Sequence, residues 1–156
     1  EPLIHGGEST TIYRSGTPTV ALAASLETAL EAAVGELPAR TARVKEANAF
    51  LRDALSKYPK VHINSPENAI PHILNLSVEN VKGTVFQREL DARGVCVSVK
   101  SACSSDGLPS RAVFAVSHDR RNALSSWRIS LSHLTTEQEL NDFMQAFDAC
   151  YSTLTQ

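Results

Sequence analysis

The segment VSVKSACSSDGLPSR, residues 97–111, places Cys103 among small polar residues directly after an alternating apolar run. Serine, aspartate and glycine around the thiol are typical of a solvated loop rather than of a packed core. A nucleophilic thiolate needs exposure and freedom to reach its target, and the nearby Lys100 favours the ionised form. Cys103 is therefore a candidate nucleophile. The alternative is a loop cysteine without chemistry, because no His–Asp pair can be placed beside it from the sequence.

A second group of residues could bind an anion. The GG pair at 6–7 and the RSGT turn at 14–17 precede a predicted helix. Such a turn presents backbone N–H groups and the positive end of the helix dipole, which together favour phosphate. The alternative is a plain helix cap, with Thr17 as N-cap and Pro18 as the first helical residue. The residues of the candidate anion site are Arg14, Ser15, Gly16 and Thr17.

The third candidate is Arg128, which lies between Trp127 and Ile129 in a predicted strand. Arginine is rarely placed in a sheet without a partner. Its planar guanidinium can bind a carboxylate through two parallel hydrogen bonds. The alternative is an edge-strand arginine that points to solvent.

The elements that must position these residues follow from the spacing of apolar side chains. Between 18 and 58 that spacing is helical, and Gly35 and Pro38 predict a break or a kink, so one bent helix or two helices are expected. From 59 onward the elements are shorter. The predicted strands cover 60–64, 72–78, 95–99 and 127–132, and the predicted helices cover 83–94, 109–117 and 135–154.

This order of elements predicts an α/β fold of the α+β layer type, with a small, mostly antiparallel sheet covered by helices. Thr136 and Glu139 have the spacing of a capping box at the start of the last helix. Cys150 in that helix is expected to be a packing residue. Cys96 is expected to point away from the face that the valines of 95–99 share.

Composition excludes several classes of function. The chain has 156 residues and a net charge of −2, without a polybasic block, so neither a nucleic acid nor an anionic membrane is an expected partner. No apolar run approaches the roughly 20 residues of a transmembrane helix. Three cysteines without paired spacing argue against a disulfide scaffold and favour a reducing, cytoplasmic setting. The histidines lack the spacing of zinc ligands, so no metal site is expected.

The joint order of these features resembles a known family. The stretches PLIHGG…YRSGTPTV, HINSPENAIPHILNLSV, GVCVSVKSACSS and WRISLSHLTTEQEL are similar to the C-terminal part of the NifS/IscS-like cysteine desulfurases. These are pyridoxal-phosphate enzymes of the class V aminotransferase superfamily, with the fold of the fold-type I transferases. The resemblance runs from Pro2 to about Tyr151. The long segment around the cysteine resembles the NifS/IscS group rather than the SufS group.

The resemblance implies a role for each candidate. Cys103 would take sulfur from L-cysteine bound to pyridoxal 5'-phosphate, releasing alanine and leaving a persulfide. An iron–sulfur scaffold or another sulfur acceptor would then receive that sulfur. Thr17, in its turn, would contact the cofactor phosphate of the other subunit of a homodimer. Arg128 would bind the carboxylate of the substrate.

The family's Schiff-base lysine lies upstream of the matching region, and so do its ring-stacking histidine and its pyridine-binding aspartate. Nothing in this chain matches them, and the chain begins EPLIHGG without a methionine. The chain is therefore expected to be a C-terminal piece of a longer enzyme and to be inactive alone. Its expected parts are 1–17, the end of the cofactor domain with the anion-binding turn; 18–58, the linking helix or helices; and 59–156, the small C-terminal α/β domain.

Departures from the family pattern leave the amino-acid substrate open. They lie at Glu8 and Ser9, at Ser117 and His118, and in the pair that follows RISL, Ser132–His133. One alternative is a related fold-type I enzyme: a selenocysteine lyase, a sulfinate desulfinase or an aminotransferase. Another is a small α/β binding module without catalysis. The sulfur acceptor, its pathway and the ability of the chain to dimerise alone also stay open.

Overall fold

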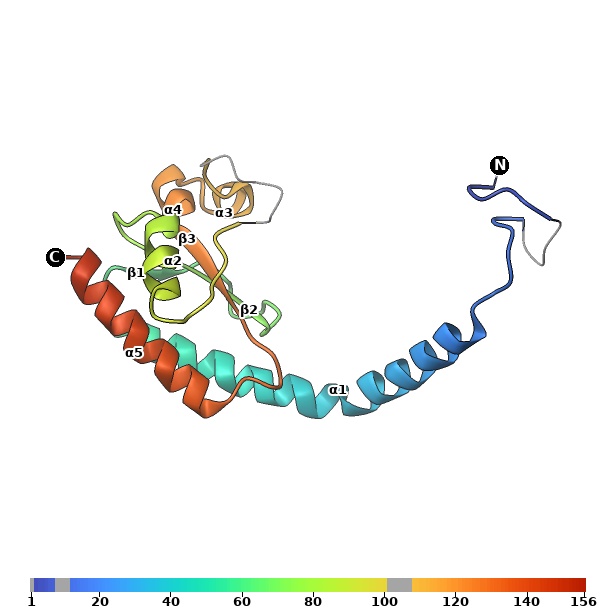
Figure 1. Ribbon diagram of the computed structural model, residues 1–156. Coiled ribbons are helices and arrows are strands. Elements are labelled where there is room, and N and C mark those ends of the chain that lie inside the picture. Colours follow the sequence, from blue (N-terminus) through green and yellow to red (C-terminus); the bar gives the residue numbers. More distant parts are fainter. Residues whose placement is uncertain (1, 8–11, 101–107) are drawn as a thin grey trace. The chain divides into compact units, whose positions relative to one another are not determined.

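The computed structural model describes residues 2–7, 12–100 and 108–156. The chain divides into two compact units, Glu1–Pro38 and Ala39–Gln156. Helix α1 (Val20–Leu55) begins in the first unit and ends in the second, and it continues through Pro38 as one helix rather than two (Figure 1). No helix among the described residues combines the length and the apolar character needed to cross a membrane.

The start of α1 differs from the sequence prediction. Thr17 was expected to be the N-cap, but the first helical residue is Val20. The Thr19 carbonyl is the acceptor for the N–H groups of Leu22 and Ala23, both at 3.1 Å, so the helical hydrogen bonds begin there. Thr17 is left outside the helix, and its exposed side chain does not take part in helix capping.

The second unit contains a three-stranded antiparallel sheet in the order β1-β2-β3. Its strands are β1 (Val61–Ile63), β2 (Ile73–Val78) and β3 (Ser126–Ser130). The central strand β2 pairs Leu76 with Trp127 and Asn75 with Arg128 of β3. The prediction of a small antiparallel sheet with helices against it is confirmed.

The predicted strand at 95–99 is wrong. Only Ser98 pairs with β3, as an isolated bridge to Arg128. Two other groups of this stretch bond to the preceding helix instead. The Val95 N–H donates to the Leu90 carbonyl at 3.0 Å, and Gln87 Nε2 donates to the Val97 carbonyl at 3.2 Å. The alternating valines reflect packing against the core, and Cys96 is exposed, as expected.

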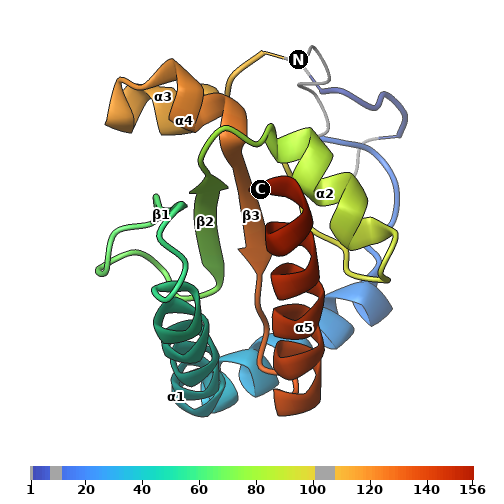
Figure 2. The same cartoon turned by 90° about the vertical axis from the view of Figure 1, so that its left-hand side faces the viewer.

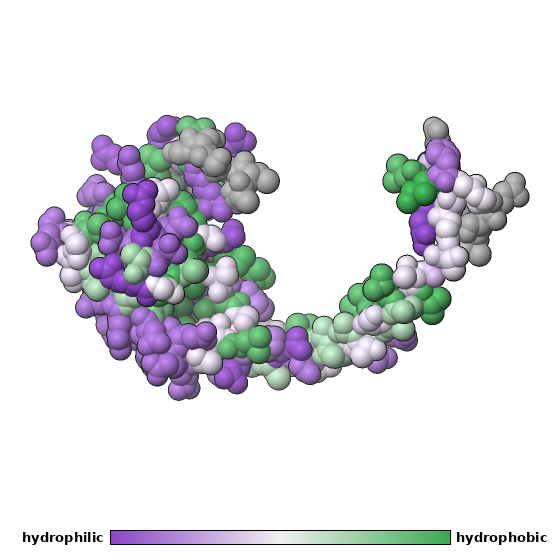
Figure 3. All heavy atoms as spheres, in the orientation of Figure 1, coloured by the Kyte–Doolittle hydropathy of each residue, from purple (hydrophilic) through white to green (hydrophobic). Residues whose placement is uncertain are grey.

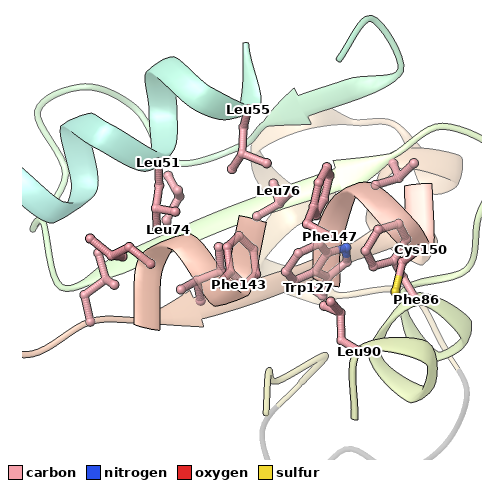
Figure 4. Close-up of a cluster of buried hydrophobic side chains, with 14 of the residues drawn as sticks. Leu51, Leu55, Leu74, Leu76, Phe86, Leu90, Trp127, Phe143, Phe147 and Cys150 are labelled. Atoms are coloured by element: carbon pink, nitrogen blue, oxygen red, sulfur yellow. The ribbon is translucent and has the colours of Figure 1, made fainter. Parts of the chain in front are cut away.

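Three helices cover the apolar face of the sheet: the second half of α1, α2 (Gly83–Asp91) and α5 (Glu137–Leu154) (Figure 2). Their side chains meet those of β2 and β3 in one hydrophobic core (Figure 4). Phe86 stacks on Trp127 with a centroid distance of 5.2 Å, and both are fully buried. The fully buried aliphatic residues of this core include Leu51, Leu55, Leu74, Leu76 and Leu90.

The last helix begins as the sequence predicts. The Glu139 N–H donates to Thr136 Oγ1 at 3.2 Å, and Glu139 Oε2 accepts from the Thr136 N–H at 2.7 Å. This reciprocal pair completes the capping box. Cys150 on the same helix is fully buried in the core, which confirms its packing role.

Two short helices, α3 (Arg111–Ser117) and α4 (Arg120–Ser125), stand where the sequence predicted one. They lie side by side (Figure 1). His118, with φ +53°, ends α3 in the left-handed conformation. Asp119 then caps α4 by accepting from the Arg121 and Asn122 N–H groups at 2.7 and 3.2 Å. The aspartate cap was the sequence signal for a second helix.

In the first unit, α1 carries a row of exposed apolar side chains, which Figure 3 shows in green along the first half of the helix. In this half of the helix the polar residues are exposed as well, so the apolar row has no packing partner among the described residues. The exposed residues of this row are Leu26, Leu30, Val34 and Leu37.

Candidate functional site

The face of the sheet opposite the core is polar. Because successive side chains of a strand point to opposite faces, Asn75 and Ser77 of β2 share this face with Arg128 of β3. Asn64, directly after β1, joins them. The sequence carried a signal for this face, since Asn75 and Ser77 interrupt the apolar run ILNLSV at alternate positions. Their role was nevertheless missed, because the partners come from segments that are distant in the sequence.

Hydrogen bonds between side chains fix this polar face. Asn64 Nδ2 donates to Asn75 Oδ1 at 2.9 Å and to Ser77 Oγ at 2.8 Å. Asn122 of α4 also belongs to the network. Its Nδ2 donates to Asn64 Oδ1 at 2.8 Å, and its backbone carbonyl accepts from Ser77 Oγ at 3.1 Å. The network holds the polar groups in one arrangement without using the Arg128 guanidinium.

Arg128 is half-buried on this face. Its Nε is buried and makes no hydrogen bond within the described chain. A buried donor without a partner costs free energy, so such a group marks a place where a ligand can supply the acceptor. A carboxylate is the ligand that the guanidinium fork fits best.

Arg128 borders a cavity of about 900 Å³. Asn64 and Asn75 line it, and so do residues of helix α3. Lys100 and Leu108, which flank the segment 101–107 in the sequence, both line the cavity. Cys103 itself lies outside the described residues. The structure describes Lys100 and Leu108, the residues on either side of the segment that carries Cys103.

The candidate anion-binding turn lies in the first unit. A parallel bridge joins Ile4 to Arg14, and the Ser15 N–H donates to the Ile4 carbonyl at 3.1 Å. The two segments approach so closely that a Cβ on Gly6 would lie 2.5 Å from Ser15 Oγ. Gly16 adopts φ +100°, which glycine tolerates far better than other residues.

Arg14 helps to build this turn. One of its terminal nitrogens donates to the Ser15 carbonyl at 3.3 Å and to the Gly16 carbonyl at 3.5 Å. Thr17 remains exposed beside it. No carboxylate occurs between residues 12 and 19, so hydroxyls, backbone N–H groups and one guanidinium make up the polar groups available there. This set of donors fits a phosphate group.

The two described thiols differ in environment. Cys96 is exposed, and its Sγ lies 4.0 Å from Asp91 Oδ1. Burial raises the pKa of the Cys150 thiol above its ordinary value. Neither cysteine lines the cavity beside Arg128. Within the described ranges, no group of three or more His, Cys, Asp or Glu side chains could hold a metal ion.

Comparison with known proteins gives a consistent set of relatives. The family described as aminotransferase class-V matches residues 5–143. A cysteine desulfurase IscS from Dictyoglomus turgidum is 36% identical over 143 residues, which is 90% of this chain and 36% of that protein. An IscS-like cysteine desulfurase from Mycobacterium tuberculosis is 32% identical over 148 residues, 90% of this chain and 37% of that protein. The chain thus spans little more than a third of the length of these relatives.

Solved structures agree with this comparison. A NifS-like protein from Rickettsia africae has a TM-score of 0.78 at 27% identity and covers 97% of this chain and 40% of its own. Another NifS-like protein has a TM-score of 0.80 at 31% identity, covering 98% of this chain and 39% of its own.

Proposed function

The chain belongs to the aminotransferase class-V family, and we propose that it is the C-terminal part of a cysteine desulfurase. The full-length enzyme would take sulfur from L-cysteine as a protein persulfide and release alanine. The observation that carries this proposal is Arg128, whose buried Nε lacks an acceptor among the described residues beside a cavity that Lys100 and Leu108 also line. The similarity to proteins named cysteine desulfurases supports it.

In this proposal Arg128 binds the carboxylate of the substrate. The Arg128 backbone is paired at the edge of the sheet, and its side chain shares a face of the sheet with the polar network of Asn64 and Asn75. An amino acid whose carboxylate pairs with Arg128 would be oriented by two hydrogen bonds and one charge. Asn64 and Asn75, which share this face of the sheet with Arg128, carry neutral amides, so Arg128 is the charged anchor on that face.

Pyridoxal 5'-phosphate, when bound, supplies an electron sink that weakens the bond between the substrate's Cβ and sulfur. The chain's own contribution toward this cofactor would be the turn of Arg14, Ser15, Gly16 and Thr17. The Thr17 hydroxyl and the backbone N–H groups of the turn would hold the phosphate, while Arg14 maintains the turn through its bonds to the Ser15 and Gly16 carbonyls. As the resemblance implies, this phosphate would belong to the cofactor of a second subunit.

Cys103 would act as the nucleophile. Its thiolate attacks the sulfur of the substrate; a sulfur–sulfur bond forms and the carbon–sulfur bond breaks. The electron pair stays with the substrate carbon, which becomes the methyl group of alanine after protonation. Cys103 follows Ser98 by five residues, and five extended residues span at most about 18 Å. A tether of this length allows one sulfur atom to approach the substrate and then a separate acceptor.

The acceptor would be an iron–sulfur scaffold or another sulfur-accepting protein, and the setting would be cytoplasmic, where thiols stay reduced. The persulfide passes its outer sulfur to an acceptor thiolate, and the Cys103 thiolate is regenerated. These are expectations for the whole enzyme, of which this chain is about a third by comparison with its relatives.

Mass spectrometry of the full-length enzyme after incubation with L-cysteine tests this function. We expect one added sulfur atom on the peptide that carries Cys103, and alanine in the supernatant. Cys103→Ser should abolish both, whereas Cys96→Ser, which removes an exposed thiol outside the cavity, should leave both unchanged. Alanine formation that survives Cys103→Ser would contradict the proposal and favour another amino-acid reaction.

A further inference from the structure

The cavity beside Arg128 carries more positive charge than an amino-acid carboxylate requires. Four cationic residues line it: Arg128, Lys100, Arg111 and Arg120. The described lining contains no aspartate or glutamate. Arg128 alone can bind one carboxylate with both donors of its fork, so the proposed substrate does not require the charges of Arg111 and Arg120.

Arg111 and Arg120 are exposed, and their side chains form no ion pair or hydrogen bond with any residue that the structure describes. Asp119 is the acidic neighbour of Arg120 in the chain. Its carboxylate accepts from the Arg121 and Asn122 N–H groups and so faces its own helix. The charges of Arg111 and Arg120 are thus left for a partner outside the described chain.

Apolar side chains lie among these cations. Leu108, Phe114 and Val116 line the same cavity and are 48%, 44% and 80% exposed. Exposed aromatic and aliphatic residues beside arginines are typical of protein interaction surfaces. A volume of about 900 Å³ lies near the upper end of the range, about 300–1,000 Å³, that holds drug-sized ligands. It leaves room for more than one small amino acid.

We propose that this surface, formed by Leu108, Arg111, Phe114, Val116 and Arg120, docks an acidic segment of the sulfur acceptor, with carboxylates on the arginines and an apolar side chain on Phe114. The identity of the partner as an acceptor rests on the proposed function. Lys100 and Leu108 flank the cysteine-bearing segment in the sequence, so a partner bound here would be within reach of its sulfur. Opposite charge would also speed the encounter.

A nucleic acid is the less favoured partner for this surface. Binding to a phosphate backbone draws on many cations along a stripe, whereas this chain has a net charge of −2. The exposed cations here are few and are interleaved with aliphatic side chains, which do not contact phosphates.

Peptide binding tests the docking surface in the 156-residue chain and in the full-length enzyme. The probe is a short fluorescent peptide of glutamate and leucine, with matched peptides in which glutamine or lysine replaces every glutamate. We expect the glutamate peptide to bind, with an affinity that falls as salt is added, and the lysine peptide not to bind. Arg111→Glu with Arg120→Glu should weaken binding by about tenfold or more.

Matched controls make the outcome specific. Arg121→Glu changes an exposed arginine of α4 that does not line the cavity, and it should alter the affinity less than about twofold. Should the double glutamate variant fail to fold, Arg111→Gln with Arg120→Gln removes the charges without reversing them and should still weaken binding severalfold. Phe114→Ser should weaken binding while preserving its salt dependence.

The proposal is overturned if Arg121→Glu weakens peptide binding as much as the double glutamate variant does. It is also overturned if the lysine peptide binds as tightly as the glutamate peptide, or if a single-stranded oligonucleotide binds more tightly than the glutamate peptide. Binding to the 156-residue chain that is absent from the full-length enzyme would also overturn it, since the enzyme itself would then cover the surface. Persulfide formation on Cys103 separates the two proposals. Persulfide without peptide binding refutes the docking surface alone, and peptide binding without persulfide refutes the desulfurase.

Discussion

Ser98 and Arg128 exchange both of their backbone hydrogen bonds: the Ser98 N–H donates to the Arg128 carbonyl at 3.1 Å, and the Arg128 N–H donates to the Ser98 carbonyl at 2.7 Å. This single bridge aligns the candidate substrate anchor with the stretch that leads to the cysteine-bearing segment. The arginine is fixed in the sheet, while only one residue of the approaching segment is paired. The candidate anchor is thus held by the sheet, and the chain leaves this pairing at Val99, before the segment 101–107 that carries the candidate nucleophile Cys103.

The role of Arg128 predicts the effect of a conservative change. Arg128→Lys keeps the charge but loses the planar fork, and hydrogen bonds to charged groups contribute about 1.5–3 kcal/mol. We therefore expect the KM for L-cysteine in the full-length enzyme to rise about tenfold to a hundredfold. Steady-state kinetics measure this change, with Arg88→Lys on the exposed side of α2 as the control. An unchanged KM in Arg128→Lys would remove the carboxylate-binding role.

Gly83 is predicted to be intolerant of a side chain. A Cβ at this position would collide with the Ser126 carbonyl at the start of β3, where backbone has little freedom to move. Gly83→Ala should lower the free energy of unfolding by about 1–3 kcal/mol. Urea unfolding of the chain, followed by the fluorescence of the buried Trp127, measures it.

Gly35 provides the matched control for Gly83. It lies inside α1, and nothing would lie within 4 Å of its Cβ. Because alanine favours the helix over glycine by about 1 kcal/mol, Gly35→Ala should raise the helical signal in far-UV circular dichroism and should not destabilise the core. If both alanine variants behaved alike, steric contact at Gly83 would not be the cause.

Stability should depend on pH through the capping box of α5. Hydrogen bonds from the Thr136 backbone and then from its hydroxyl hold the pKa of Glu139 below its ordinary value. Ionised Glu139 therefore adds stability that is complete above the unfolded-state pKa of about 4.3 and is lost as the pH falls through the lower folded-state pKa. Urea unfolding at a series of acidic pH values measures this loss.

Two variants isolate the contribution of Glu139. Glu139→Gln should flatten this part of the pH profile, because the side chain can no longer ionise. Thr136→Ser keeps both partners of the capping box and should preserve the profile. A profile that is the same in Glu139→Gln as in the original chain would show that other carboxyl groups cause the loss.

The two described thiols should differ in reactivity. Burial raises the pKa of Cys150 and excludes reagent, whereas Cys96 is exposed. In the folded Cys103→Ser chain near neutral pH, iodoacetamide should modify Cys96 faster by a factor on the order of 100. Peptide mapping by mass spectrometry identifies the modified thiol, and denaturant should abolish the difference. Rapid labelling of Cys150 in the native chain would contradict the packed core around α5.

Local signals in the sequence were sufficient for elements whose partners are near in the chain. The capping box of Thr136 and Glu139 was predictable because both groups lie within one helical turn. Local signals failed at 95–99, where alternating valines predicted a strand. The backbone there bonds to α2 through Gln87 and Leu90, and alternation cannot distinguish such packing from strand pairing.

By itself, the sequence determined the antiparallel α+β architecture and the family resemblance, since these depend on residue type and short-range order. Only the tertiary structure decided that Arg128 shares a polar face with Asn64 and Asn75, and that Arg111 and Phe114 border the same cavity. These residues are brought together by strand register and by the turn at His118. Spacing along the chain cannot specify such contacts, because they form between distant segments only when the core closes.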